Sequence, residues 1–449
     1  MIKPLMINAF DPDAVDGLDN ETIRLIERRK QVLGPSYKLF YERPVHAVSA
    51  EGVWITDGQG QRYLDVYNNV PSVGHSHPRV VEAVSRQMAL LNTHTRYLND
   101  VVLSYAEKLL GHFPSELSNV MFTCTGSESS DLALRIAKTH TGGAGIVVTE
   151  NAYHGLTEQI ARMSPSLGVG VPLWPNVRTV PAPDAYRLGP EKVAEVFSTS
   201  IKEAFEDLSR HGFKPAAFVA DMVFSSDGIF ADPPGFLKPA LDAVHAAGAL
   251  FIADEVQPGF GRTGPMWGFA RHGIVPDLVL MGKPMGNGLP IGGVVARPEV
   301  LGEFAAIARY FNTFGGNPVC CAAAHATLSV IEDEGLAENS LNVGNYLQRG
   351  LRERTAGLAA VGDIRGAGLF VGLDFVKDSR TREPDGDLGL FVVNALRDRN
   401  ILISASGVEG NVLKIRPPLP FATEHADIFL DAFEHVIRST EFQRKAAVQ

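Results

Sequence analysis

The stretch "PDLVLMGKPMGNGLPIGGV" runs from Pro276 to Val294 and holds one basic side chain, Lys283, at the end of an apolar run. Similar short apolar runs recur along the chain, and helix-like amphipathic segments separate several of them. The clearest runs cover residues 145–150, 216–221, 249–254, 277–282 and 292–297. Continuous apolar strands that alternate with helices are typical of a mostly parallel sheet with helices on both faces. The sequence therefore predicts an α/β fold.

The pattern changes near Pro318, where a long helical stretch (319–360) leads into fewer strands. We therefore expect a large domain over residues 71–318, and a long connecting helix followed by a smaller α+β domain over residues 319–449. Residues 1–70 are expected to contribute to the small domain, because residues 52–66 resemble a β-hairpin around Asp57-Gly58. A chain of 449 residues can bury these cores without disulfides or a structural metal.

Composition argues against several classes of function. The net charge of −10 is spread along the chain without a block of Lys and Arg, which disfavours nucleic acid or an anionic membrane as a partner. No stretch approaches the roughly 18 apolar residues of a membrane helix, and the amino terminus lacks a targeting pattern. The three cysteines lack the spacing of a zinc site or a disulfide framework, so we expect a cytoplasmic protein. His75, His77 and His154 have no further ligands at metal spacing, so we expect no metal.

Three chemically distinct groups follow predicted strands. The run 249–254 ends in Asp254, the run 277–282 is followed by Lys283, and Gly126-Ser127 begin a helix after residues 119–123. Ligands of open α/β sheets bind at the carboxyl ends of the strands. A lysine with a lowered pKa forms Schiff bases, and a helix amino terminus binds phosphate. With an acid for the pyridine nitrogen, these groups match what pyridoxal 5'-phosphate (PLP) requires.

Three blocks of sequence resemble the signatures of the class III aminotransferases, PLP enzymes of fold type I. They are "IADEVQPGFGRTG" (252–264), the opening stretch (276–294) and "FNTFGGNP" (311–318). The resemblance covers about residues 26–437 and implies a large domain with a mostly parallel seven-stranded sheet, a smaller α+β domain, and a homodimer with shared active sites.

The same resemblance implies a role for each of eight residues. Lys283 would form the Schiff base with the cofactor, and Asp254 would pair with the pyridine nitrogen. Gly126 and Ser127 would hold the phosphate. The other four implied residues are Tyr153 stacked on the ring, Val256 on its opposite face, Gln257 near the ring hydroxyl, and Thr313, which would reach the phosphate of the neighbouring subunit's cofactor.

Further segments resemble ethanolamine-phosphate phospho-lyases and their hydroxylysine-phosphate relatives, which share this scaffold but eliminate phosphate. They include "YLDVYNNVPSVGHSHPRVV" (63–81), "VGDIRGAGLFVGLDFVKD" (361–378) and "NVLKIRPPLPF" (411–421). Lys414 and Arg416 stand where typical class III aminotransferases have an arginine and an alanine. Two cations suit a phosphomonoester better than a carboxylate. Residues 414 and 416 share a face of a strand, but the sequence leaves open whether that face meets substrate or solvent.

These observations favour a PLP-dependent phospho-lyase that acts on a small amino-alkyl phosphate such as phosphoethanolamine and gives an aldehyde, ammonia and phosphate. The alternative is an ω-type class III transaminase that moves an amino group from an amine or amino acid to a keto acid. Asp221-Met222, where many transaminases have Glu-Pro, weakens that alternative. A PLP-binding regulator and a nicotinamide dehydrogenase fit less well, because no helix-turn-helix segment and no G-x-G-x-x-G motif after the first strand is present.

Overall fold

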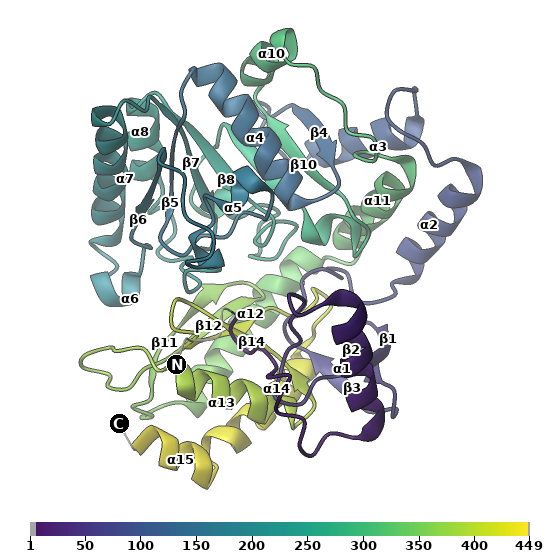
Figure 1. Ribbon diagram of the computed structural model, residues 1–449, viewed down its shortest axis with the longest axis vertical. Helices are drawn as coiled ribbons and strands as arrows, with labels where there is room; N and C mark the ends of the chain where they lie inside the picture. Colours follow the sequence, from purple (N-terminus) through teal and green to yellow (C-terminus); the bar gives the residue numbers. More distant parts are fainter. Residues whose placement is uncertain (1–5, 448–449) are drawn as a thin grey trace.

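The computed structural model describes residues 6–447, which form a large domain above a smaller one in the view of Figure 1. Within these residues the large domain has a seven-stranded sheet in the order β4-β10-β9-β8-β7-β5-β6. β10 pairs antiparallel with β4 and β9, and the other pairs are parallel. The predicted α/β fold with a mostly parallel seven-stranded sheet is thus confirmed. The strands are β4 (Asn119–Thr123), β5 (Gly145–Thr149), β6 (Val177–Val180), β7 (Pro215–Asp221), β8 (Leu250–Asp254), β9 (Leu278–Met281) and β10 (Gly292–Ala296).

Helices cover both faces of this sheet, because alternate residues of its buried strands are apolar on both sides. Phe218 and Phe251 join a core with α7 and α8, whereas Val219 and Ile252 join a second core with α4. The helices of this domain are α2 (Pro78–Leu90), α3 (Asp100–Leu110), α4 (Gly126–Thr141), α5 (Glu158–Ala161), α6 (Ala185–Leu188), α7 (Val193–Arg210), α8 (Lys238–Ala246), α9 (Gly268–Arg271), α10 (Pro298–Ile307) and α11 (Pro318–Asp333).

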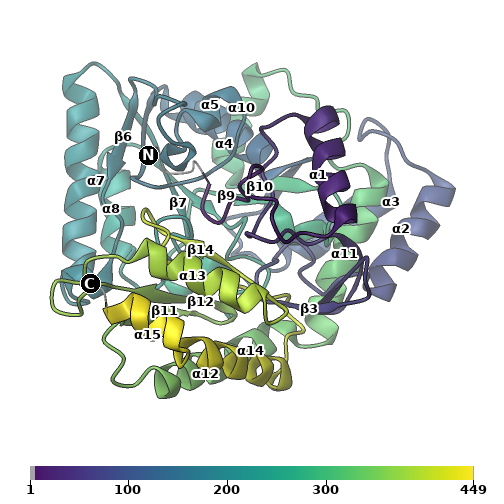
Figure 2. The same cartoon turned by 60° about the horizontal axis from the view of Figure 1, so that its bottom comes forward.

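The small domain is assembled from amino-terminal and carboxyl-terminal segments, drawn in purple and in yellow-green, which make up the lower part of the molecule in Figure 1 and are seen from another side in Figure 2. β3 pairs in parallel with β13, so that Leu64 lies opposite Ile401. β2 and β3 form the predicted hairpin, which is confirmed by the pairing of Thr56 with Arg62. The elements are α1 (Asn20–Leu33), β1 (Ala47–Glu51), β2 (Trp54–Asp57), β3 (Arg62–Asp65), α12 (Leu336–Arg354), β11 (Val361–Ala367), β12 (Phe370–Phe375), α13 (Gly386–Arg397), β13 (Ile401–Leu402), β14 (Ser404–Ser406), β15 (Val412–Ile415), α14 (Thr423–Ile437) and α15 (Thr440–Ala447).

A second sheet of the small domain, in the order β11-β12-β15-β14 within the described residues, carries the segment that contains Lys414. One core joins the amino-terminal strands to this sheet and to the carboxyl-terminal helices, and it includes Tyr63, Leu64, Leu373 and Phe433. Of the predicted domain ranges 1–70 and 319–449, residues 1–5 and 448–449 lie outside the described part of the chain.

The helical stretch expected over residues 319–360 is divided into α11 and α12. Gly335 interrupts it with a φ of +60°, a left-handed conformation that ends α11 and starts α12. α12 then packs closely on the turn between β11 and β12. A Cβ atom on Gly344 would lie 2.0 Å from the carbonyl oxygen of Gly368, so this contact requires glycine.

We predict that Gly344→Ala lowers the free energy of unfolding by about 2 kcal/mol or more, because the new methyl group meets rigid backbone. Gly302→Ala in α10 is the matched control, since a Cβ atom there meets nothing within 4 Å. It should raise stability by about 0.5 kcal/mol, because alanine favours a helix interior. Chemical denaturation of both variants measures the difference, and equal stabilities would contradict the proposed contact.

Candidate active site

The carboxyl ends of β7, β8 and β9 meet the start of α4 at one edge of the large sheet. Asp221 ends β7 and lies opposite Asp254, which ends β8. Lys283 follows β9. A Cβ atom on Gly282 would lie 3.2 Å from the backbone nitrogen of Gly126, the first residue of α4. The structure thus brings an amine, two carboxylates and a helix amino terminus together.

Asp254 is buried and held in a fixed orientation. Its Oδ2 atom lies 2.7 Å from Nδ1 of His154, and its Oδ1 atom accepts a hydrogen bond of 3.0 Å from the backbone N–H of Val256. Nε2 of His154 is buried and has no hydrogen-bond partner within residues 6–447. The contacts with His154 and Val256 therefore fix the orientation of the Asp254 carboxylate.

Lys283 lies among charged groups although its side chain remains accessible to solvent. Desolvation by the surrounding protein and the positive charge of Arg416 lower the pKa of Lys283, while Asp254 and Asp221 act against this shift. A lowered pKa increases the fraction of neutral amine, which is the form that reacts with carbonyl compounds.

The start of α4 provides a cradle for phosphate. Gly126 and Ser127 occupy its first two positions, where backbone N–H groups have no partner inside the helix. The Ser127 hydroxyl accepts a 3.2 Å hydrogen bond from the N–H of Leu156 and keeps its own proton for donation. A Cβ atom on Gly126 would lie 3.1 Å from Cγ2 of Val256, so glycine lets these two segments meet.

Tyr153 lies next to this cradle and is half-buried. Burial and the negative charge of Asp254 raise the pKa of Tyr153, which places its ring near that carboxylate. The amine, the buried acid, the free N–H groups and the flanking Tyr153 and Val256 side chains together fit the chemical requirements of PLP.

Gln257 takes part in a chain of four side chains. Arg416 donates to the Gln257 carbonyl oxygen, Gln257 donates to the Ser225 hydroxyl, and Ser225 donates to Asp221. All donors in this chain point in the same direction, from a cation to a carboxylate. Partial burial and the charge of Asp254 raise the pKa of Asp221.

Lys414 and Arg416 face the interior, which resolves the orientation that the sequence left open. Their exposed fractions are 7% and 5%. Burial and the positive charge of Arg416 lower the pKa of Lys414 well below its ordinary value, and Asp221 opposes this shift. Burial also lowers the pKa of Arg416. Both groups interact electrostatically with Lys283, so the shared face of this segment meets the site.

Aromatic side chains that the sequence analysis did not select surround these cations. The Arg416 guanidinium lies 5.0 Å from the ring centre of Tyr67 and 5.6 Å from that of Phe370. Its Nε atom donates a 3.1 Å hydrogen bond to the Tyr67 carbonyl. Ser225 and Asp221 were also missed as site residues. The end of β7 signals Asp221 in the same way as the end of β8 signals Asp254, whereas no local pattern signals Tyr67, Ser225 or Phe370.

Thr313 does not join this cluster through any contact in the described residues. It is exposed in the segment between α10 and α11. Its neighbour Asn312 donates a 2.9 Å hydrogen bond to Glu128 in the first turn of α4. The role of Thr313 at a neighbouring subunit's cofactor therefore stays a prediction.

The histidines that were considered as metal ligands in the sequence contact carboxylates in the structure. His75 pairs with Asp65 at 2.8 Å and His77 pairs with Glu334 at 3.2 Å. Within residues 6–447 no group of three or more His, Cys, Asp or Glu side chains is arranged to hold a metal ion. Over the same residues, no helix combines the length and the apolar character that crossing a membrane demands.

Comparison with known proteins adds independent information. A family model described as aminotransferase class-III matches residues 40–437. An alanine–glyoxylate aminotransferase 2-like protein of Drosophila melanogaster is 39% identical over 443 residues, which cover 95% of this chain and 89% of that protein. An ethanolamine-phosphate phospho-lyase homolog 1 of Caenorhabditis elegans is 37% identical over 421 residues, which cover 88% of this chain and 89% of that protein.

A solved structure has a very similar fold. A phospholyase from Arthrobacter, in complex with phosphoethanolamine, is 42% identical to this chain and superposes with a TM-score of 0.89. The match covers 92% of this chain and 99% of that one.

We predict that Lys283→Ala abolishes turnover and leaves PLP bound without a covalent link, because no other amine is placed at the end of β9. Absorbance spectra and borohydride reduction followed by mass spectrometry measure the link. Lys202→Ala on the exposed face of α7 is the control and should retain both the link and the activity. A Lys283→Ala protein that still turns over, or that forms the link at another lysine, would contradict the assignment.

Proposed function

This chain belongs to the class-III aminotransferase family, whose members depend on PLP, and within that family we propose that it is a phospho-lyase. The proposed substrate is a small amino-alkyl phosphate such as phosphoethanolamine. The proposed products are an aldehyde, ammonia and inorganic phosphate.

The buried pair Lys414 and Arg416 is the observation that supports this proposal most. Both side chains are buried in the site that contains Lys283, and electrostatic interactions link Arg416 to Lys283 and Lys283 to Lys414. A phosphomonoester carries nearly two negative charges and three acceptor oxygens, so it suits two neighbouring basic side chains better than a single carboxylate does.

Two relatives support the same substrate class by their names. The Arthrobacter protein is called a phospholyase and was solved with phosphoethanolamine, and the C. elegans protein is named as a phospho-lyase homolog. The Drosophila relative is named as an aminotransferase of the alanine–glyoxylate type. An ω-type transaminase that passes an amino group to a keto acid is therefore the second candidate.

Each side chain of the site has a defined task in the proposed elimination. PLP supplies an electron sink for the carbon that bears the substrate nitrogen. The neutral amine of Lys283 removes a proton from that carbon. Lys414 and Arg416 hold the phosphate on the adjacent carbon and stabilise it as the C–O bond breaks and the electron pair leaves with the phosphate oxygen. Water then converts the released enamine to the aldehyde and ammonia.

We also propose a homodimer in which the apolar surface around Thr313 is covered by a second copy. Phe314 and Leu98 near this surface are 69% and 98% exposed. The His94 ring stacks on Tyr97 at 5.0 Å and meets Phe311 at 5.8 Å, so segments 94–98 and 311–314 form one continuous patch. A large exposed apolar patch usually marks an interaction surface.

A cytoplasmic location is part of the same proposal. It rests on the cysteines, all three of which lie in the described part of the chain and are free.

The deciding experiment mixes PLP-loaded protein with phosphoethanolamine in the absence of any keto acid and measures phosphate and acetaldehyde. Release of both over many turnovers is the expected result. No release, combined with amino transfer to pyruvate from a panel of amines, would replace the proposal with the transaminase alternative.

Lys414→Met should raise KM for phosphoethanolamine about 10- to 100-fold, since a charge-assisted hydrogen bond to the phosphate is lost. Lys377→Met is the matched control, because that exposed lysine pairs with Glu383 far along the chain from the site residues, and it should leave KM unchanged. An unchanged KM in Lys414→Met would contradict the role of this cation.

Thr313→Ala should weaken PLP retention, because the proposed dimer places this hydroxyl at the partner's cofactor phosphate. Dialysis followed by fluorescence of the retained cofactor measures the loss. Thr381→Ala, an equally exposed threonine in the small domain, serves as the control. Equal retention in both variants would count against the dimeric arrangement of the site.

A further inference from the structure

A row of four residues crosses the small-domain sheet and faces the large domain. Arg365 on β11 lies opposite Gly372 on β12, which lies opposite Lys414 on β15, which in turn lies opposite Ser404 on β14. Residues directly opposite in neighbouring strands project from the same face of a sheet. Arg365 and Lys414 therefore share a face, and Gly372 leaves a gap between them.

The gap in this row is filled by the large domain. A Cβ atom on Gly372 would lie 3.2 Å from Cδ1 of Ile229. Ile229 belongs to the segment 225–230 that follows β7, which we call the Ser225 turn. The turn lies against the row, and the hydroxyl of Ser225 belongs to the hydrogen-bond chain between Arg416 and Asp221.

Both cations of the row bind carbonyl groups of the Ser225 turn. Arg365 donates from Nη2 to the Gly228 oxygen at 2.7 Å and from Nε to the Ile229 oxygen at 2.9 Å. Lys414 donates to the Ser225 oxygen at 3.5 Å, and the Ser406 hydroxyl of β14 donates to the same oxygen. The small domain therefore holds the turn at both ends.

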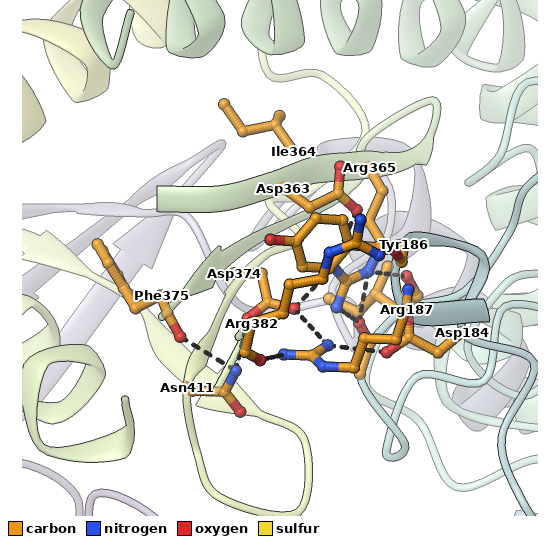
Figure 3. A network of polar contacts seen from close by, with 12 residues as sticks. Asp184, Tyr186, Arg187, Asp363, Ile364, Arg365, Asp374, Phe375, Arg382 and Asn411 are labelled. Carbon is orange, nitrogen blue, oxygen red and sulfur yellow. Dashed lines mark hydrogen bonds and ion pairs between the residues drawn. The ribbon is translucent and has the colours of Figure 1, made fainter. Parts of the chain in front are cut away.

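Arg365 is itself held by two carboxylates, that of the buried Asp374 and that of the partly buried Asp363, as Figure 3 shows. Its Nη1 atom lies 3.0 Å from carboxylate oxygens of both Asp363 and Asp374. Its guanidinium lies 4.7 Å from the ring centre of Phe230. Asp374 also accepts a 2.6 Å hydrogen bond from the Asn411 side chain. All three nitrogens of Arg365 are thus engaged.

A second arginine approaches Asp374 from the large domain (Figure 3). Arg187 of α6 lies 3.0 Å from Asp374 and 2.8 Å from Asp184. It also donates a 3.0 Å hydrogen bond to the carbonyl of Arg382. Asp374 therefore forms ion pairs with an arginine of each domain, Arg365 of the small domain and Arg187 of the large domain.

A buried ion network of this size adds little net stability, because desolvation of the charges offsets their attraction. Its effect is to define geometry, since an arginine that donates to two carbonyls and two carboxylates tolerates little displacement. These contacts determine where Lys414 and Arg416 of the β15 segment lie relative to Ser225 and Gln257 of the large domain.

We propose that Arg365 is a positioning residue that locks the Ser225 turn to the small-domain sheet and thereby sets where Lys414 and Gln257 stand relative to Lys283. The identity of the anion held by Lys414 rests on the proposed phospho-lyase function. The locking itself depends only on the contacts of Arg365.

The test variant is Arg365→Lys in the PLP-loaded protein. Lysine keeps a positive charge beside buried Asp374 but lacks the planar fork that binds two carbonyls. We expect KM for phosphoethanolamine to rise about tenfold, because a displaced Lys414 binds the phosphate of the substrate less well. Arg354→Lys is the matched control, since Arg354 pairs with Asp431 and Glu434 inside the small domain, and it should leave KM unchanged.

A second readout needs no substrate. The pH midpoint of the visible band of the Lys283–PLP Schiff base reports the charges that face Lys283. They are Arg416 and Lys414 from the β15 segment, Asp254 from β8 and Asp221 from β7. If Arg365→Lys lets β15 recede, the two cations act less strongly and the midpoint rises above that of the wild type. The control variant should keep the wild-type midpoint.

A raised midpoint, or a raised KM, supports the proposal. An unchanged midpoint and KM in a folded Arg365→Lys protein, even one with a lower melting temperature, would overturn it by showing a structural role alone. If this variant does not fold, Arg187→Gln at the rim of the network should raise the midpoint by a smaller amount, and no change there would also overturn it. If the wild type releases no phosphate, the phospho-lyase proposal fails, while the midpoint still decides the role of Arg365.

Discussion

The burial of two basic side chains, Lys414 and Arg416, beside Lys283 is the constraint on which the rest of the site depends. The two side chains lie on one face of one segment, and burial together with the charge of Arg416 lowers the pKa of Lys414. Such a pair is costly in an empty protein and becomes favourable when a multiply charged anion enters. Burial and the charge of Arg416 also lower the pKa of Lys283. In the proposed reaction, one arrangement of groups would therefore both activate the amine of Lys283 and favour a phosphate substrate.

The hydrogen-bond chain from Arg416 to Asp221 explains how this charge is kept available. A carboxylate directly on Arg416 would neutralise it, whereas the amide oxygen of Gln257 orients the guanidinium without cancelling its charge. The acid of the chain stands two side chains away, behind Ser225. Because each donor in the chain points the same way, the groups polarise one another. The position of Ser225 therefore influences both ends of the site.

Features of the fold and the site that depend on short local patterns could be predicted from the sequence. Strand ends identified Lys283 and Asp254, and apolar runs identified the mostly parallel sheet. The reversed direction of β10 was not predicted, because an apolar run has no direction. The break of the long helix at Gly335 was also missed, since an isolated glycine is tolerated in a helical pattern. Ser225, Tyr67 and Arg365 could not be identified as parts of the site, because each makes at least one of its decisive contacts with a residue more than a hundred positions away in the chain.

The parallel pairing of β3 with β13 has a consequence for how the protein is made. Leu64 leaves the ribosome more than three hundred residues before its partner Ile401, so the amino-terminal strands emerge long before their sheet can be completed. The seven strands of the large sheet all lie between them and can assemble first, since domains fold as units during synthesis. Lys414 and Arg416 are among the last residues synthesised. These two buried basic side chains therefore reach a site whose large-domain half can already be formed, and the proposed anion pocket is completed only when translation is nearly over.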